Sequence, residues 1–288
     1  MSHRLVVVLA LALAAVSVAA CQERVLLTRD AALEVDGDIE RRDGDASAAA
    51  DGDGALRVCT ITDAHGITGL GDYAPLPAGR WRLLVAGAYY WRSTSPTIWQ
   101  ERGHLSAILD ALPVVDGRRV WDGSGVTAIA WRGYATHLYS RDLHWRLDSV
   151  GATSESGHAS VFLPPSPPTV SGLLPWEGEG ITGVDLHDTQ RITFFSGPRF
   201  YRYTDSTSPR WTESGTVDVL WPALPPVEGA YPWDPPGVTG YHDDGATRTI
   251  LSGDRYWVVD HVSGDALEAS GLASEHWADV PAIEVPCE

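Results

Sequence analysis

The 288-residue sequence contains no lysine, so all 21 of its basic residues are arginine. Its aspartates and glutamates outnumber them at 38. The formal charge of −17 argues against a nucleic-acid-binding surface, because such surfaces neutralise phosphates with clustered cations. Methionine occurs once and cysteine three times, whereas tryptophan occurs 12 times. With 44% hydrophobic and 20% charged residues, the composition excludes a mainly disordered chain.

Familiar catalytic and metal motifs are also missing. The sequence has no G-x-S-x-G, H-E-x-x-H or C-x-x-C. Residues 178–183 match G-x-G-x-x-G, but the match overlaps a box that recurs without the other glycines, so it does not indicate a dinucleotide site. We therefore assign no catalytic residue and expect no required cofactor.

The ten histidines are scattered along the chain. His144 replaces an aromatic residue in a repeated box, so we expect it to pack in the core. His187 and His242 follow predicted inner strands and could join a metal site on one rim, with Asp243 and Asp244 beside the second. Histidines that are simply hydrogen-bonded or solvated are the alternative, and we prefer it.

The first 20 residues have the pattern of a secretory signal peptide. One arginine precedes an apolar run of about 16 residues, which is short for a membrane span of about 20. Val18-Ala19-Ala20-Cys21 resembles a bacterial lipobox, which implies that Cys21 is acylated and becomes the new N-terminus. Ordinary cleavage after Ala20, leaving a free thiol, is the alternative.

Residues 21–56 are predicted to form the acylated Cys21 and an acidic, flexible tether. The segment is rich in Asp, Gly and Ala, and it contains Asp-Gly-Asp three times without the spacing of a calcium loop. Acyl chains would hold the protein at the membrane, because its negative charge gains no attraction from anionic lipids. Gln22 is not the Asp associated with inner-membrane retention, which favours the outer membrane or cell surface of a bacterial envelope.

From Cys59 onward the chain repeats one unit four times. A six-residue motif, here called the first box, occurs four times and ends in an aromatic residue each time. These aromatic residues are separated by 54, 56 and 56 positions: Trp91, Trp145, Tyr201 and Trp257. A second box, Gly-Ile/Val-Thr-Gly/Ala, begins at Gly66, Gly125, Gly180 and Gly237. Two independent boxes that keep one period indicate a repeat architecture.

Each unit has the composition of short strands. Residues 191–195 and 200–203 are β-branched and aromatic, and they flank a link of turn formers at 196–199, which predicts a hairpin. Glycine in the second box permits close approach of backbones, as expected where inner strands crowd an axis. We predict an all-β fold, a single four-bladed β-propeller over 57–288, with blades at about 57–114, 118–168, 172–226 and 230–287.

The repeat resembles the hemopexin-like repeat, with close matches at residues 200–203 (Phe-Tyr-Arg-Tyr) and 220–225 (Leu-Trp-Pro-Ala-Leu-Pro). The resemblance implies a disulfide between Cys59 and Cys287 that joins the first and last blades. Two unrelated thiols are the alternative. An exported protein resides where disulfides persist.

In the hemopexin-like family the start of each inner strand lines a central channel, where backbone groups hold ions such as calcium. The corresponding residues are all threonine: Thr68, Thr127, Thr182 and Thr239. The family usually has Asp there, and Thr keeps the carbonyl but removes the charge. We expect at most a weakly bound calcium or sodium ion, or hydroxyls bonded to one another or to water.

The resemblance and the domain layout predict a non-catalytic binding module, anchored by lipid at the cell envelope. Its partner would be an extracytoplasmic protein or other ligand, and not nucleic acid. Binding or acquisition of haem or metal is one alternative. The other is an enzyme with an unrecognised site on the rim, which a compact cluster of His and carboxylates would favour.

Overall fold

The structure is a computed structural model that describes residues 58–60, 67–73, 81–93, 99–188, 191–205, 208–261, 266–281 and 283–286. The predicted signal peptide, Cys21 and the tether lie outside the described residues. So do Cys287 and the side chain of Cys59. No helix in the described part of the chain is long and apolar enough to cross a membrane.

Four sheets of four antiparallel strands form the fold, and each sheet keeps its strands in sequence order. The first blade contains β2 (Gly69–Tyr73), β3 (Trp81–Ala86), β4 (Tyr89–Ser93) and β5 (Glu101–His104), followed by α2 (Ser106–Leu109). The second contains β6 (Ala128–Arg132), β7 (Ala135–Ser140), β8 (Leu143–Leu147) and β9 (Thr153–His158), followed by α3 (Ala159–Phe162).

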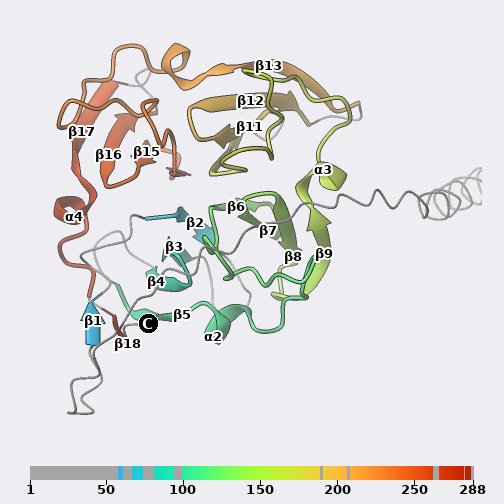
Figure 1. Cartoon of the computed structure of the whole chain (residues 1–288), viewed down its shortest axis with the longest axis vertical. Coiled ribbons are helices and arrows are strands. Elements are labelled where there is room, and N and C mark those ends of the chain that lie inside the picture. Colours follow the sequence, from blue (N-terminus) through green and yellow to red (C-terminus); the bar gives the residue numbers. More distant parts are fainter. Residues whose placement is uncertain are drawn as a thin grey trace, which may run out of the picture. The chain divides into compact units, whose positions relative to one another are not determined.

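The other two blades repeat this order. The third contains β10 (Gly183–Asp188), β11 (Arg191–Ser196), β12 (Arg199–Thr204) and β13 (Arg210–Thr216), followed by the short 3₁₀ helix η2 (Val217–Val219). The fourth contains β14 (Gly240–Asp243), β15 (Thr247–Ser252), β16 (Arg255–Asp260) and β17 (Ala266–Leu272), followed by α4 (Ala273–His276). The predicted four-bladed, all-β propeller is therefore confirmed (Figure 1).

The innermost strands β2, β6, β10 and β14 surround the axis, and each lies beside the next around the ring (Figure 1). The segment before an inner strand runs along a hairpin turn of the preceding blade. Ile181 N donates to Arg141 O over 2.9 Å, and Val238 N donates to Gly197 O over 2.9 Å. Backbone contacts of this kind leave no room for a side chain, which explains the glycines of the second box.

The first box forms the hairpin between the second and third strands of each blade. In the third blade Ser196 pairs with Arg199, so the turn is Gly197-Pro198, two residues rather than the four expected from the sequence. The other blades have the same register, because each pair of strands ends on residues three positions apart. Gly197 adopts φ +57, which fits a two-residue turn that follows the twist of the strands.

The aromatic residue that ends each first box is buried, and its polar atom reaches a carbonyl of a segment that follows a blade. Trp145 Nε1 donates to Pro113 O over 2.9 Å, and Trp257 Nε1 donates to Pro225 O over 2.8 Å. Trp91 donates to Pro281 O, and the hydroxyl of Tyr201 donates to Leu173 O. One residue thus supplies a large apolar surface and satisfies a backbone acceptor, which explains why an aromatic residue recurs at this position in each blade.

The two ends of the ring meet in a separate two-stranded sheet. Strand β1 (Val58–Thr60) pairs antiparallel with β18 (Glu284–Pro286), so that Cys59 lies opposite Val285. Residues from before the first blade and after the fourth are therefore neighbours in space (Figure 1).

Candidate ligand-binding site at the channel axis

Three of the four threonines predicted to line the channel, Thr68, Thr127 and Thr182, contact the next blade through their hydroxyl groups. Thr127 Oγ1 accepts a hydrogen bond from Arg141 N at 2.9 Å and donates to Ile181 O of the next blade at 2.6 Å. Thr68 and Thr182 donate likewise to Val126 O and Val238 O, and all four accept from a hairpin-turn amide of their own blade. The hydroxyls of Thr68, Thr127 and Thr182 thus donate to backbone carbonyls. Ion binding by the threonine carbonyls stays a prediction.

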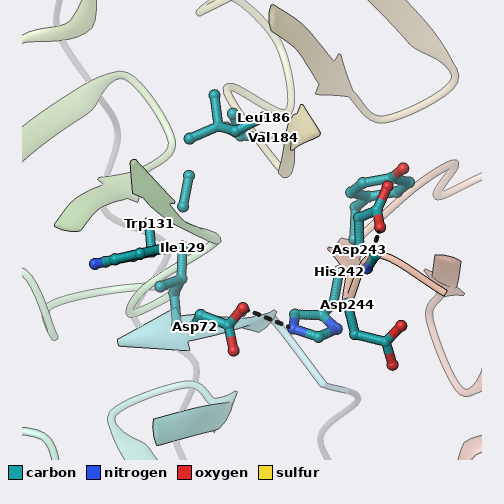
Figure 2. Close-up of a pocket in the computed structure, with 12 residues that line it drawn as sticks. Asp72, Ile129, Trp131, Val184, Leu186, His242, Asp243 and Asp244 are labelled. Atoms are coloured by element: carbon teal, nitrogen blue, oxygen red, sulfur yellow. Dashed lines mark hydrogen bonds and ion pairs between the residues drawn. The ribbon is translucent and has the colours of Figure 1, made fainter. Parts of the chain in front are cut away.

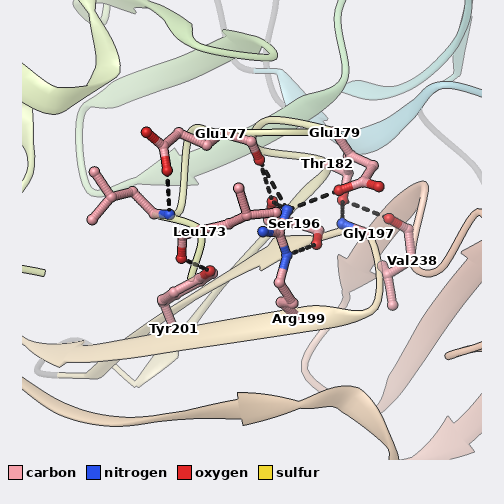
Figure 3. A network of polar contacts seen from close by, with 10 residues as sticks. Leu173, Glu177, Glu179, Thr182, Ser196, Gly197, Arg199, Tyr201 and Val238 are labelled. Atoms are coloured by element: carbon pink, nitrogen blue, oxygen red, sulfur yellow. Dashed lines mark hydrogen bonds and ion pairs between the residues drawn. The ribbon is translucent and has the colours of Figure 1, made fainter. Parts of the chain in front are cut away.

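A buried arginine supports the same junction in the third blade (Figure 3). Arg199 is 3% exposed, and its Nη2 donates to Glu179 Oε2 at 2.8 Å, Glu177 O at 2.9 Å and Ser196 Oγ at 2.9 Å. Glu177 in turn accepts from Leu174 N at 2.7 Å. These contacts hold the loop before β10 against the hairpin turn of the same blade, next to the turn's backbone contact with Val238 of the fourth blade.

A cavity of about 240 Å³ opens at the axis, lined by all four inner strands. Its walls consist of Gly71 and Asp72 from β2, residues 129–131 from β6, Val184 and Leu186 from β10, and residues 241–245 from β14 and the turn after it. We call this cavity the axial pocket. It occupies the point where the repeat brings four equivalent strand segments together.

The axial pocket has one apolar and one acidic wall. Ile129, Val184 and Leu186 lie on one side, and the carboxylate of Asp72 faces the imidazole of His242 on the other (Figure 2). Asp72 Oδ2 lies 3.3 Å from His242 Nε2, and these side chains are only 12% and 4% exposed. The contact joins the first and fourth blades at the axis.

Two further carboxylates extend the acidic wall. Asp243 Oδ2 lies 2.8 Å from His261 Nδ1 and 3.3 Å from Arg248 Nε. Gly245 N donates a hydrogen bond to Oδ1 of Asp243 (Figure 2). Asp244 Oδ2 lies 3.3 Å from Arg82 Nη2 of the first blade.

Asp244 contributes a negative charge to the acidic wall. Burial raises the pKa of Asp244, but hydrogen bonds from Thr247 N and Ala246 N, together with the charge of Arg82, outweigh burial and lower it. Asp244 is therefore ionised at neutral pH. Arg82 and Arg248 each form an ion pair with one carboxylate of this wall, Asp244 and Asp243 respectively.

A second, larger cavity lies between the second and third blades. It has a volume of about 680 Å³, and we call it the side pocket. His137 and His144 line it, with their rings stacked and His137 Nδ1 3.0 Å from His144 Nε2. Burial, with the nearby charges of Arg146 and Arg132, lowers the pKa of His137 to about 4. Burial, with His137 and Arg146, lowers that of His144 to about 3.

The histidine pair should make the propeller sensitive to mild acid. Since the folded-state pKa of His144 is depressed below 6.5, the unfolded chain binds the proton more readily, so stability falls as the pH drops from about 6.5 towards 3. At pH 5 we expect a loss of about 2 kcal/mol from His144, with a further loss from His137. Urea denaturation followed between pH 7 and pH 5 measures this loss.

His144→Phe is the matched variant for that measurement, because the equivalent position in the third blade is Phe200. The variant should fold and should lose a smaller part of its stability between pH 7 and pH 5. An unchanged pH dependence in His144→Phe would show that another group causes the acid sensitivity.

The structure places most of the histidines that the sequence singled out. His144 is buried at 2% exposure, as expected from its place in the box. His242 lies in the axial pocket beside Asp243 and Asp244, whereas the side chain of His187 is outside the described part. Within the described ranges, no group of three or more His, Cys, Asp or Glu side chains could hold a metal ion. Sequence analysis missed Asp72, which comes from a different blade.

No family model matches the sequence, and no curated protein matches it. Solved structures do match. A hemopexin-fold protein, CP4, from cow pea is 11% identical, with a TM-score of 0.50 over 75% of this chain and 96% of that chain. A 2S albumin seed protein from Dolichos is 12% identical, with a TM-score of 0.51 over 75% and 99%. An albumin from Cicer arietinum showing hemagglutination is 11% identical, with a TM-score of 0.50 over 74% and 96%. At these identities the likeness shows the fold, which is that of the hemopexin-type propeller.

Proposed function

We propose that this protein is an extracytoplasmic binding module whose propeller holds a small organic cation in the axial pocket. The observation that carries the proposal is the division of that pocket into an apolar wall and an acidic wall formed by Asp72, Asp243 and Asp244. An ammonium group would lie against the carboxylates, and a short hydrocarbon chain would cover Ile129, Val184 and Leu186. Concave sites with apolar walls and a few placed polar groups are typical of ligand binding.

Binding rather than catalysis fits the groups in this pocket. Burial and the charge of Asp185 raise the pKa of Tyr241 well above its usual value, so its hydroxyl stays protonated at neutral pH. Asp243 and Asp244 are held by arginine or backbone amides. The hemopexin-fold neighbours include seed albumins, one of which shows hemagglutination, and this supports a role in recognition.

The location of the module is proposed from the sequence alone. Signal peptide 1–20 would direct export, and acylated Cys21 with the acidic tether would hold the propeller at the outer membrane or cell surface. A tether rich in like charges extends, which would keep the axial pocket accessible to an external ligand or protein partner.

A series of n-alkylammonium ions from ethyl to hexyl, each matched with the corresponding alcohol, tests the proposed ligand class by calorimetry. We expect the ammonium ions to bind and the alcohols not to bind, because the carboxylates of the acidic wall attract only the cation. Asp72→Asn keeps the shape of the side chain but removes one charge, and it should weaken binding by about tenfold, or about 1.4 kcal/mol.

Asp110→Asn is the matched control, because it removes the same charge from an exposed side chain outside the axial pocket. Its affinity should equal that of the parent. Equal binding of alcohols and ammonium ions, or no binding of either, would contradict the proposal.

A further inference from the structure

In the second blade a serine side chain contacts a histidine, and the other ring nitrogen of that histidine lies near an aspartate. Ser160 Oγ lies 2.6 Å from His158 Nδ1, and His158 Nε2 lies 3.5 Å from Asp142 Oδ2. Arg118 Nη2 lies 3.0 Å from both oxygens of Asp142. The three residues come from the β7–β8 turn, the end of β9 and the start of α3, and none of them lines the axial pocket or the side pocket.

The backbone fixes the tautomer of His158. Ser160 N donates to His158 Nδ1 over 3.3 Å, so Nδ1 carries the lone pair and the proton is on Nε2, which faces Asp142. The hydroxyl of Ser160 must then donate to Nδ1. Burial raises the pKa of Asp142, but its contacts with Arg118 and its own backbone amide outweigh burial and lower it, so the carboxylate is ionised. A serine that donates to a histidine whose other nitrogen faces a carboxylate has the polarity needed for nucleophilic attack.

The other blades offer an internal comparison. One backbone hydrogen bond recurs in every blade and identifies the residues that correspond to one another. In the second blade this bond runs from Ala159 N to Asp142 O. The first blade has the same pair, with His104 Nδ1 2.8 Å from Ser106 Oγ, but Ala88 stands where the second blade has Asp142. The fourth blade has the aspartate and the serine, Asp254 and Ser274, but Leu272 replaces the histidine. In the third blade Pro198, Thr216 and Asp218 replace the aspartate, the histidine and the serine. Of the four blades described, the second combines all three groups.

We propose that Ser160 is a nucleophile for acyl transfer from carboxylic esters, with His158 as its general base and Asp142 as the residue that positions His158. Ser160 Oγ forms a bond to the acyl carbon while its proton moves to His158 Nδ1. The ester C–O bond then breaks, and the leaving alcohol takes that proton. Water then attacks the acyl carbon while His158 takes a proton from the water. The bond between Ser160 Oγ and the acyl carbon breaks, His158 returns the proton to Ser160, and the carboxylic acid is released. Val161, 74% exposed beside Ser160, and Trp176, whose ring centroid is 6.2 Å from that of His158, offer apolar surface for the acyl chain.

A fluorophosphonate reagent tests this site on the full chain, because attack by an activated serine forms a stable O–P bond and releases fluoride. We expect one modification, at Ser160 by peptide mass spectrometry, and its loss in Ser160→Ala. His158→Asn is the decisive variant: asparagine still accepts a hydrogen bond as the helix cap but cannot take a proton. It should keep the melting temperature and slow labelling at least 100-fold. Asp142→Asn should slow labelling while leaving Ser160 as the modified residue.

Ser106→Ala and His104→Asn are the matched controls in the first blade, and neither should change the rate of labelling. The proposal is overturned if the reagent leaves Ser160 unmodified, labels Ser106 and Ser160 equally, or reacts with His158→Asn as fast as with the parent. The axial pocket takes no part in these outcomes, so they are independent of the alkylammonium experiment.

Discussion

Gly125→Ala is expected to prevent stable folding of the propeller. Gly125 has φ +67, and a Cβ built on it would lie 1.7 Å from Gly87 O, a backbone atom in the hairpin turn of the first blade. A flexible side chain could move aside, but this carbonyl is fixed by the strand pairing of the blade. The clash would separate the first two blades, and we expect a loss of at least about 4 kcal/mol, a large part of the 5–15 kcal/mol typical of a whole domain.

Gly123→Ala is a close control for this substitution. Gly123 has φ +65, nearly the value at Gly125, but a Cβ there would meet nothing within 4 Å. It should cost only about 1–2 kcal/mol, the usual penalty for a left-handed backbone. Urea denaturation of both variants separates backbone strain from the contact between blades. Similar losses in the two variants would contradict the proposed role of Gly125.

Most of the fold could be predicted because the repeat is encoded by short-range requirements. Three positions in each unit require a particular type of residue. They are the two-residue turn of the first box, the buried aromatic position after it, and the position where a neighbouring backbone leaves room only for glycine. Because these requirements recur in each blade, the same residue types recur at a regular spacing in the sequence. A third periodic element was missed: a tight turn with positive φ at Asp116-Gly117, Ser171-Gly172 and Glu228-Gly229, which joins each of the first three blades to the next.

The axial pocket could not be predicted in the same way, because its residues differ from blade to blade. The fourth residues of the inner strands all line it, and they are Asp72, Trp131, Leu186 and Asp243. Periodicity marks the position but not the chemistry, which depends on how four different side chains combine. Aligning the inner strands position by position is the signal that would have brought Asp72 together with Asp243.

Cys59→Ser is expected to lower the melting temperature sharply, on the proposal that Cys59 and Cys287 form a disulfide. Strand β1 pairs Cys59 with Val285, and Cys287 comes two residues later in the sequence. A bridge here would close a loop that contains all four blades. In the chain-entropy model such a loop contributes about 5 kcal/mol by restricting the unfolded chain.

The same bond would matter for the propeller because the pairing that closes its ring is short. Strands β1 and β18 have three residues each, and a two-stranded ladder of this length is not stable alone. Cys21→Ser is the control, since it removes the remaining cysteine, which lies outside the propeller, and it should leave the melting temperature unchanged. Reduction of the parent should reproduce the loss seen in Cys59→Ser, and a melt that neither change affects would mean that β-sheet pairing alone closes the ring.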